Sequence, residues 1–160
     1  MKNKVAIRKR VIVTLLLLVL FVIPIVAVKS NVNADTFGVF KYSVSNDGNI
    51  VIVGLSDTSV TTIDIPSEID GKPVTMIEKG AFQYCKNIKK VNIADSVEKI
   101  GDYAFVGCTG ITGTLAIPNS VREIGYYGFY GCTGITGTLV IPDSVETIGY
   151  SAFEGCTGVT

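Results

Sequence analysis

Cysteine is the residue type whose spacing in this sequence most directly suggests chemistry. Its four copies, Cys85, Cys108, Cys132 and Cys156, are separated by 23, 24 and 24 residues. Cysteine thiolates bind zinc and act as nucleophiles, and four cysteines in an extracellular chain could form two disulfides. The sequence has no C-x-x-C pair and no histidine, so we expect neither a zinc site nor a histidine-activated thiol. The regular spacing favours one buried free thiol per repeat, and a bridge between adjacent repeats stays open as the alternative.

Other catalytic chemistry has little support in the sequence. The absence of histidine removes the commonest general base. Neither a G-x-x-x-x-G-K-S/T loop nor a dinucleotide-binding glycine motif occurs. Carboxylates such as Asp95, Glu98 and Asp102 are scattered, which indicates a solvated face. We therefore expect no enzymatic activity, no catalytic residues, no metal and no cofactor.

Tyrosine gives the best signal for ligand binding. Its hydroxyl and large ring make it common at recognition surfaces. Six tyrosines gather around the same part of the repeat: Tyr84, Tyr103, Tyr126, Tyr127, Tyr130 and Tyr150. Inward positions there belong to Phe and Ala, so we expect most of these rings to face outward. They either bind a ligand or merely cover the edge of the structure, and the sequence favours the two interpretations equally.

A second candidate surface is the outward face of the main predicted sheet. It is small, polar and flat, which suits broad contact with a protein or glycan. Its expected residues are Thr62, Asp64, Asn92, Thr114, Ala116, Thr138 and Val140.

These residues belong to an internal repeat, which is the main signal of the sequence. The period of 23 or 24 residues recurs in a phenylalanine column, Phe82, Phe105, Phe129 and Phe153, and in an isoleucine column, Ile77, Ile100, Ile124 and Ile148. One unit shows the expected local structure: alternating residues 114–117 predict a strand, Pro118 ends it, and residues 126–130 predict a single helical or 3₁₀ turn. We expect the Phe and Cys columns to form the core. One unit cannot bury its apolar side alone, so the units must stack into a solenoid.

The chain divides into three parts. Residues 1–34 resemble an export signal, because six basic residues and no acidic ones accompany the uncharged run Val11–Val28, and Val32-Asn33-Ala34 offers small residues before a cleavage site at Asp35. An uncleaved membrane anchor is the alternative, although Pro24 would break a continuous helix. Residues 35–60 predict a capping hairpin around Asn46-Asp47-Gly48. Residues 61–160 hold about four repeats, with Asp70-Gly71-Lys72 as an inserted loop.

Charge and the last repeat limit the partners. Beyond residue 34 the chain has 8 basic and 14 acidic residues, which disfavours nucleic acid and anionic lipid. Contact with a membrane is expected only through an uncleaved N-terminal segment.

The sequence stops at Thr160, where another strand should begin, so we expect a truncated array whose exposed last coil associates end to end or frays.

The repeat resembles the BspA-like leucine-rich-repeat family of bacterial surface proteins, whose pattern reads L-x-I-P-x-S-V-x-x-I-G-x-x-A-F-x-x-C. Ile141-Pro142-Asp143-Ser144-Val145, Ile148-Gly149, Ala152-Phe153 and Cys156 match it, whereas Ala94 replaces the usual proline. The resemblance implies a secreted or cell-surface protein that acts in adhesion and protein recognition, and it implies no catalytic residue. The main hypothesis is therefore an extracellular binding module. A structural stalk that presents a further domain is the alternative.

Overall fold

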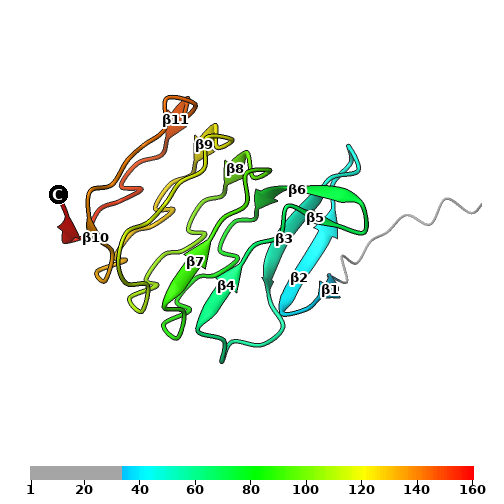
Figure 1. The fold of residues 1–160 in the computed structure, drawn as a ribbon, viewed down its shortest axis with the longest axis horizontal. Helices are drawn as coiled ribbons and strands as arrows, with labels where there is room; N and C mark the ends of the chain where they lie inside the picture. Colours follow the sequence, from blue (N-terminus) through cyan, green and yellow to red (C-terminus); the bar gives the residue numbers. More distant parts are fainter. Residues whose placement is uncertain (1–33) are drawn as a thin grey trace, which may run out of the picture. The chain divides into compact units, whose positions relative to one another are not determined.

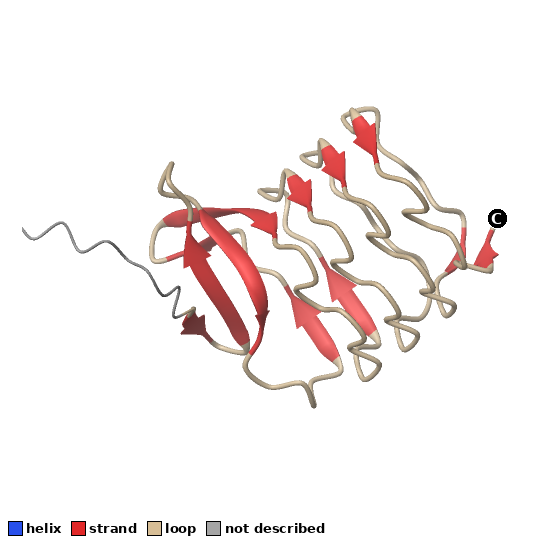
Figure 2. Cartoon of the chain, turned by 180° about the vertical axis from the view of Figure 1, so that it is seen from behind, coloured by secondary structure: helices blue, strands red, loops and turns tan. Residues whose placement is uncertain are grey.

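The computed structural model describes residues 34–160, which form strands, turns and loops with no helix (Figures 1 and 2). The described part therefore contains no helix that could cross a membrane. Its strands are β1 Asp35–Phe37, β2 Phe40–Val44, β3 Ile50–Leu55, β4 Thr62–Asp64, β5 Glu68–Ile69, β6 Lys72–Ile77, β7 Lys90–Asn92, β8 Lys99–Ile100, β9 Glu123–Ile124, β10 Thr136–Gly137, β11 Thr147–Ile148 and β12 Gly158–Val159.

The repeats stack as coils of a solenoid, as the period predicts. The long sheet runs in the order β1-β2-β3-β6-β8-β9-β11, and its members from β3 onward pair in parallel. A second parallel pair, β4 with β7, lies on the other side of the coils (Figure 1), and an isolated parallel bridge joins Ala116 to Val140 farther along the stack. We number the coils from 1 to 4 by their Phe column, as residues 62–85, 90–108, 114–132 and 138–156.

Stacked phenylalanine rings fill the centre of the solenoid. Phe82, Phe105 and Phe129 are fully buried. The ring centroids of Phe82 and Phe105 are 5.0 Å apart, those of Phe105 and Phe129 are 4.9 Å apart, and those of Phe129 and Phe153 are 5.4 Å apart. Each coil thus covers the ring of its neighbour, which is why one coil cannot form a core alone. Phe153, in the last coil, is only partly buried.

The N-terminal end is covered by an antiparallel hairpin. β2 and β3 pair across a tight turn in which the Gly48 N–H donates to the Ser45 carbonyl at 3.0 Å. β3 then pairs in parallel with β6, so the hairpin extends the long sheet. The inserted segment, expected to be a loop, forms a hairpin between β5 and β6 instead. Asp70 and Gly71 both have positive φ, at 53° and 72°, which is the geometry of a two-residue hairpin turn.

The helical turn expected at residues 126–130 is absent, and that part of the prediction was wrong. Alternate N–H groups donate to the next coil: those of Tyr127 and Phe129 donate to the carbonyls of Tyr150 and Ala152 at 3.0 and 2.8 Å. The intervening Gly128 N–H closes a turn on the Gly125 carbonyl at 3.2 Å. A 3₁₀ segment would instead use every N–H within the segment. Stacking of coils therefore turns this stretch into linked β-turns that share hydrogen bonds with the next coil.

Candidate functional site

The tyrosines lie on a stretch of each coil with an unusual backbone. Two positions per coil, two residues before and two residues after the core Phe, have φ between 53° and 79°. Bulky residues rarely adopt this left-handed conformation, whereas glycine does so freely. The pairs in coils 1 to 4 are Gly80 and Tyr84, Tyr103 and Gly107, Tyr127 and Gly131, and Ser151 and Gly155. Tyrosine therefore occupies three of these eight positions, and glycine or serine occupies the other five.

Four tyrosine rings form a connected cluster, which we call the tyrosine edge: Tyr103, Tyr127, Tyr130 and Tyr150. Tyr103 and Tyr127 stack with ring centroids 5.2 Å apart and planes at 11°. Tyr130 and Tyr150 meet Tyr127 edge-on, at 5.4 and 5.9 Å. The Lys79 ammonium lies 5.6 Å from the Tyr103 centroid, a cation–π distance. The parallel register of the coils brings these residues together, because equivalent positions lie beside one another.

The tyrosine edge faces outward. Tyr150 is 69% exposed and Tyr130 is 37% exposed, while the stacked Tyr103 and Tyr127 are partly covered. Desolvation, and to a lesser extent the neighbouring Tyr150 and Tyr103, raise the pKa of Tyr127 above its ordinary value. The edge thus offers ring surface and hydroxyl groups that donate and accept hydrogen bonds.

Two predicted tyrosines stand apart from this cluster. Tyr126 is 56% exposed, and its N–H donates to the Asp102 carboxylate at 2.9 Å. Tyr84 is 62% exposed. A Cβ placed on Gly107 would lie 2.4 Å from the Tyr84 ring, so this ring packs over the glycine of the next coil.

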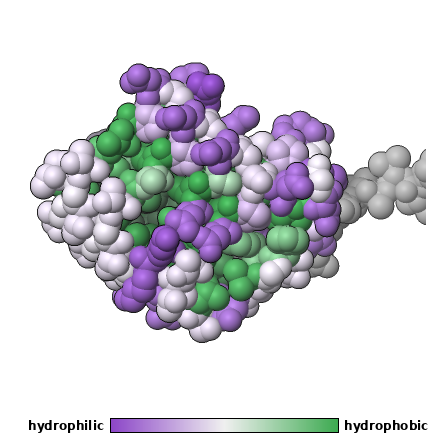
Figure 3. Space-filling model, viewed as in Figure 1, coloured by the Kyte–Doolittle hydropathy of each residue, from purple (hydrophilic) through white to green (hydrophobic). Residues whose placement is uncertain are grey.

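The predicted sheet-face residues are separate from the tyrosine edge. Thr114 and Thr138 are exposed on the strand side of coils 3 and 4, and among residues 34–160 no hydrogen bond or aromatic contact joins them to the tyrosines. The whole expected set is exposed: Thr62, Asp64, Asn92, Thr114, Ala116, Thr138 and Val140. Figure 3 shows green apolar surface between purple hydrophilic side chains on the side of the molecule seen in Figure 1. This face changes from polar Asp64 and Asn92 to apolar Ala116 and Val140 along the stack.

The cysteines are free thiols that belong to the core. The Cys108 thiol donates to the Phe82 carbonyl of the previous coil at 2.9 Å, and the Cys132 and Cys156 thiols make the equivalent bonds at 3.1 and 3.2 Å. Desolvation raises the pKa of Cys108 to about 12 and that of Cys132 further. Cys85 and Cys156 are half-buried, and desolvation raises the pKa of both. The buried Cys108 and Cys132 thiols therefore stay protonated at neutral pH and are poor nucleophiles. No group of His, Cys, Asp and Glu suited to a metal ion occurs within the described part of the chain.

The last coil is less buried than the coil before it. Ile148 is 48% exposed, whereas Ile124, the residue equivalent to Ile148 in coil 3, is fully buried. Association end to end stays a prediction.

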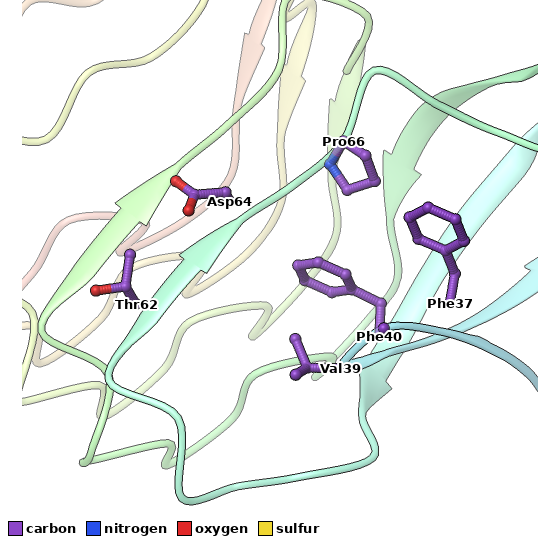
Figure 4. Close-up of a pocket in the computed structure, with 7 residues that line it drawn as sticks. Phe37, Val39, Phe40, Thr62, Asp64 and Pro66 are labelled. Carbon is purple, nitrogen blue, oxygen red and sulfur yellow. The ribbon is translucent and has the colours of Figure 1, made fainter.

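The sequence missed one concave site, and the expectation that the sheet face is flat was wrong, because Thr62 and Asp64 of that face line this site. It lies between the hairpin cap and coil 1, and it is lined by Phe37, Gly38, Val39, Phe40, Thr62, Asp64 and Pro66 (Figure 4). These residues carry no shared motif, because they come from the cap and from the first coil, and only folding brings them together.

Comparison with known proteins identifies the repeat. The model of the BspA type leucine-rich repeat region matches residues 75–160. No curated protein matches the sequence significantly. Two solved leucine-rich repeat proteins resemble the fold: one from Bacteroides capillosus, with 26% identity and a TM-score of 0.65 over 72% of this chain and 86% of that one, and one from T. pallidum, with 24% identity and a TM-score of 0.62 over 79% and 69%. A third, from Bacteroides ovatus, has 24% identity and a TM-score of 0.55 over 78% of this chain and 39% of that one.

Proposed function

Because the chain belongs to the BspA-type leucine-rich repeat family, we propose that it is an exported protein that recognises another protein through the tyrosine edge. Leucine-rich repeat proteins of this type are generally non-enzymatic binding scaffolds, and the family is consistent with protein–protein recognition. A role in adhesion at a cell surface follows if the recognised protein is on a neighbouring cell.

The observation that carries this proposal is the placement of Tyr103 and Tyr127 in the left-handed region. Their φ is 57° in both cases, and a left-handed residue with a side chain costs about 1–2 kcal/mol. Their stacking returns about 0.5–1.5 kcal/mol. The two rings therefore add little or nothing to the stability of the fold, and glycine occupies the equivalent position in coil 1. A surface role in binding explains why large aromatic side chains are present there.

The test replaces both stacked rings by glycine. We expect Tyr103→Gly/Tyr127→Gly to be at least as stable as the parent, because relief of strain at two positions (about 2–4 kcal/mol) exceeds the lost stacking (about 0.5–1.5 kcal/mol). Capture of cell-surface proteins on the immobilised chain should be saturable for the parent and should fall at least tenfold for the variant. Tyr84→Gly is the matched control, since Tyr84 has the same φ of 57° and lies outside the tyrosine edge; it should bind as the parent does.

The outcomes separate the two candidate functions. Saturable capture that is unaffected by the double substitution would move recognition to another surface. A complete lack of saturable capture by the parent would contradict recognition and would favour a structural stalk.

Export is the second part of the proposal. The basic start, the apolar run Val11–Val28 and the Val32-Asn33 pair lie outside the described residues, and they support export from the sequence alone. β1 begins at Asp35, so cleavage before Asp35 would leave this strand whole. We expect mass spectrometry of protein recovered outside the cells to give Asp35 as the first residue. An intact N-terminus in the membrane fraction would replace secretion by anchoring.

A further inference from the structure

The edge of β4 that faces the cap has free hydrogen-bonding groups. On its other edge, Thr61 accepts a hydrogen bond from the Lys90 N–H at 3.2 Å, and the Ile65 N–H donates to Asn92 at 2.9 Å. Residues of a strand in a parallel ladder alternate in direction, so the N–H and C=O groups of Thr62 and Asp64 point away from β7. Within residues 34–160 no main-chain partner meets these groups.

The cap leaves this edge open. It joins the solenoid through the pairing of β3 with β6, in the other sheet. Beside β4 the cap instead contributes Phe37 and Phe40 to the wall of a pocket of about 270 Å³. In Figure 4, Phe40 and Pro66 lie next to β4, and Phe37 lies farther out. Phe40 is 6% exposed and Phe37 is 46% exposed, so one ring forms the floor and the other is available to a ligand.

The free edge of β4 and the pocket beside it form a groove. We propose that this groove binds an extended peptide of a partner protein, which adds to β4 as a further strand. Strand addition takes its affinity from main-chain hydrogen bonds and its specificity from pockets for alternate side chains. Here the main chain of Thr62 and Asp64 supplies the hydrogen bonds, and the apolar pocket supplies the specificity.

The lining of the groove defines the chemistry of the peptide. A side chain that points inward meets Phe40, Val39 and Pro66, so it must be apolar. The next side chain along points outward, where it lies beside the exposed Asp64 carboxylate on β4. Asp64, whose carboxylate also accepts a hydrogen bond from the Asn92 amide, is the only charged residue that lines this pocket, so a lysine or arginine complements it. The groove therefore fits a segment in which apolar and basic residues alternate.

The short length of β4 explains why a pocket is needed. Its three residues offer few hydrogen bonds, and short edge strands with charged residues resist unspecific pairing. An extended peptide gains enough free energy to bind only when one of its side chains also enters the pocket. This site is separate from the tyrosine edge, so the proposal does not depend on the function proposed above.

The test uses two hexapeptides of equal composition, both acetylated and amidated, with the 160-residue chain. The alternating peptide Lys-Val-Lys-Val-Lys-Val should bind saturably, at least tenfold more tightly than the block peptide Lys-Lys-Lys-Val-Val-Val. Hydrogen exchange followed by NMR reports the mode of binding. The Thr62 and Asp64 amides should exchange fast in the free protein and slow at least tenfold with the alternating peptide, whereas the Ile63 amide is protected in both states.

Substitutions locate the site. Thr62→Pro removes an N–H that β7 does not use, so it should weaken binding about tenfold, as expected for a lost hydrogen bond and a blocked approach. Phe37→Ser should weaken binding about fivefold without disturbing β4. Val44→Ser is the matched control, because Val44 is also 46% exposed and lies outside the pocket.

Three results would overturn the proposal. Equal binding of the two peptides would show that charge alone attracts them. Binding without protection of Thr62 and Asp64 would exclude strand addition. Equal effects of Phe37→Ser and Val44→Ser would exclude the pocket. None of these results bears on the tyrosine edge, whose ligand and variants are different.

Discussion

Replacement of Phe129 by alanine tests whether the stacked phenylalanine rings hold the solenoid together. Phe129 is fully buried, and its ring lies between Phe105 at 4.9 Å and Phe153 at 5.4 Å. Removing a buried phenylalanine ring costs about 3–5 kcal/mol, since transfer energy and packing are both lost. The total stability of the 127 described residues is expected to be about 6–19 kcal/mol. Phe129→Ala should therefore remove a large fraction of the stability without unfolding the whole chain.

The location of the damage is as informative as its size. Each coil contacts only its neighbours, so the loss should concentrate in coils 2 to 4 and leave the cap hairpin folded. Phe153→Ala is the matched control. Phe153 has the same residue type and column but is only partly buried, and it should cost about 1–2 kcal/mol because less apolar surface leaves water on folding.

Urea denaturation measures the free energy of unfolding, and residue-resolved hydrogen exchange measures where protection is lost. The expected pattern is a loss of protection around Ala104 and Ala152 with retained protection in β2 and β3. A Phe129→Ala protein that unfolds at the urea concentration of the parent would refute the role given to the ring column. Equal costs for Phe129→Ala and Phe153→Ala would refute the link between burial and stability along the stack.

Two further predictions concern the thiols and the glycines. Desolvation raises the pKa of Cys108 to about 12 and that of Cys132 further, so only about one Cys108 thiol in 10⁴ is ionised at pH 8. Mass spectrometry after iodoacetamide treatment should find both cysteines unmodified in folded protein and modified in urea. Rapid labelling in folded protein would contradict their burial. A Cβ on Gly110 would lie 2.0 Å from the Lys86 carbonyl oxygen, whereas one on Gly113 meets nothing within 4 Å at a φ of 80°. Thermal or urea unfolding should therefore show a loss of about 3 kcal/mol for Gly110→Ala and about 1 kcal/mol for Gly113→Ala, and equal losses would show that strain outweighs the contact between coils.

The repeat period by itself determined the architecture of the chain. A Phe, an Ile and a Cys that recur every 23 or 24 residues must occupy equivalent places in stacked coils, because no coil can bury them alone. The family resemblance, carried by the pattern around Ile141-Pro142 and Ala152-Phe153, is confirmed by the match over residues 75–160. The absence of histidine likewise limits the chemistry of the chain, because no arrangement of its residues can supply an imidazole base.

Tertiary structure decided the features that depend on contacts between coils. The stretch around Tyr127 was expected to form a helical or 3₁₀ turn, yet the N–H groups of Tyr127 and Phe129 bond to the next coil, so it forms linked turns. The left-handed φ of Tyr103 and Tyr127 could not be predicted, because tyrosine does not favour that conformation. The pocket between Phe40 and Pro66 joins segments with no shared pattern. The free edge of β4 arises only because the cap pairs with β6 in the other sheet. The repeat period specifies which residues occupy equivalent positions in the coils. Packing between coils sets their backbone conformation, and the position of the cap leaves one edge of β4 without a partner.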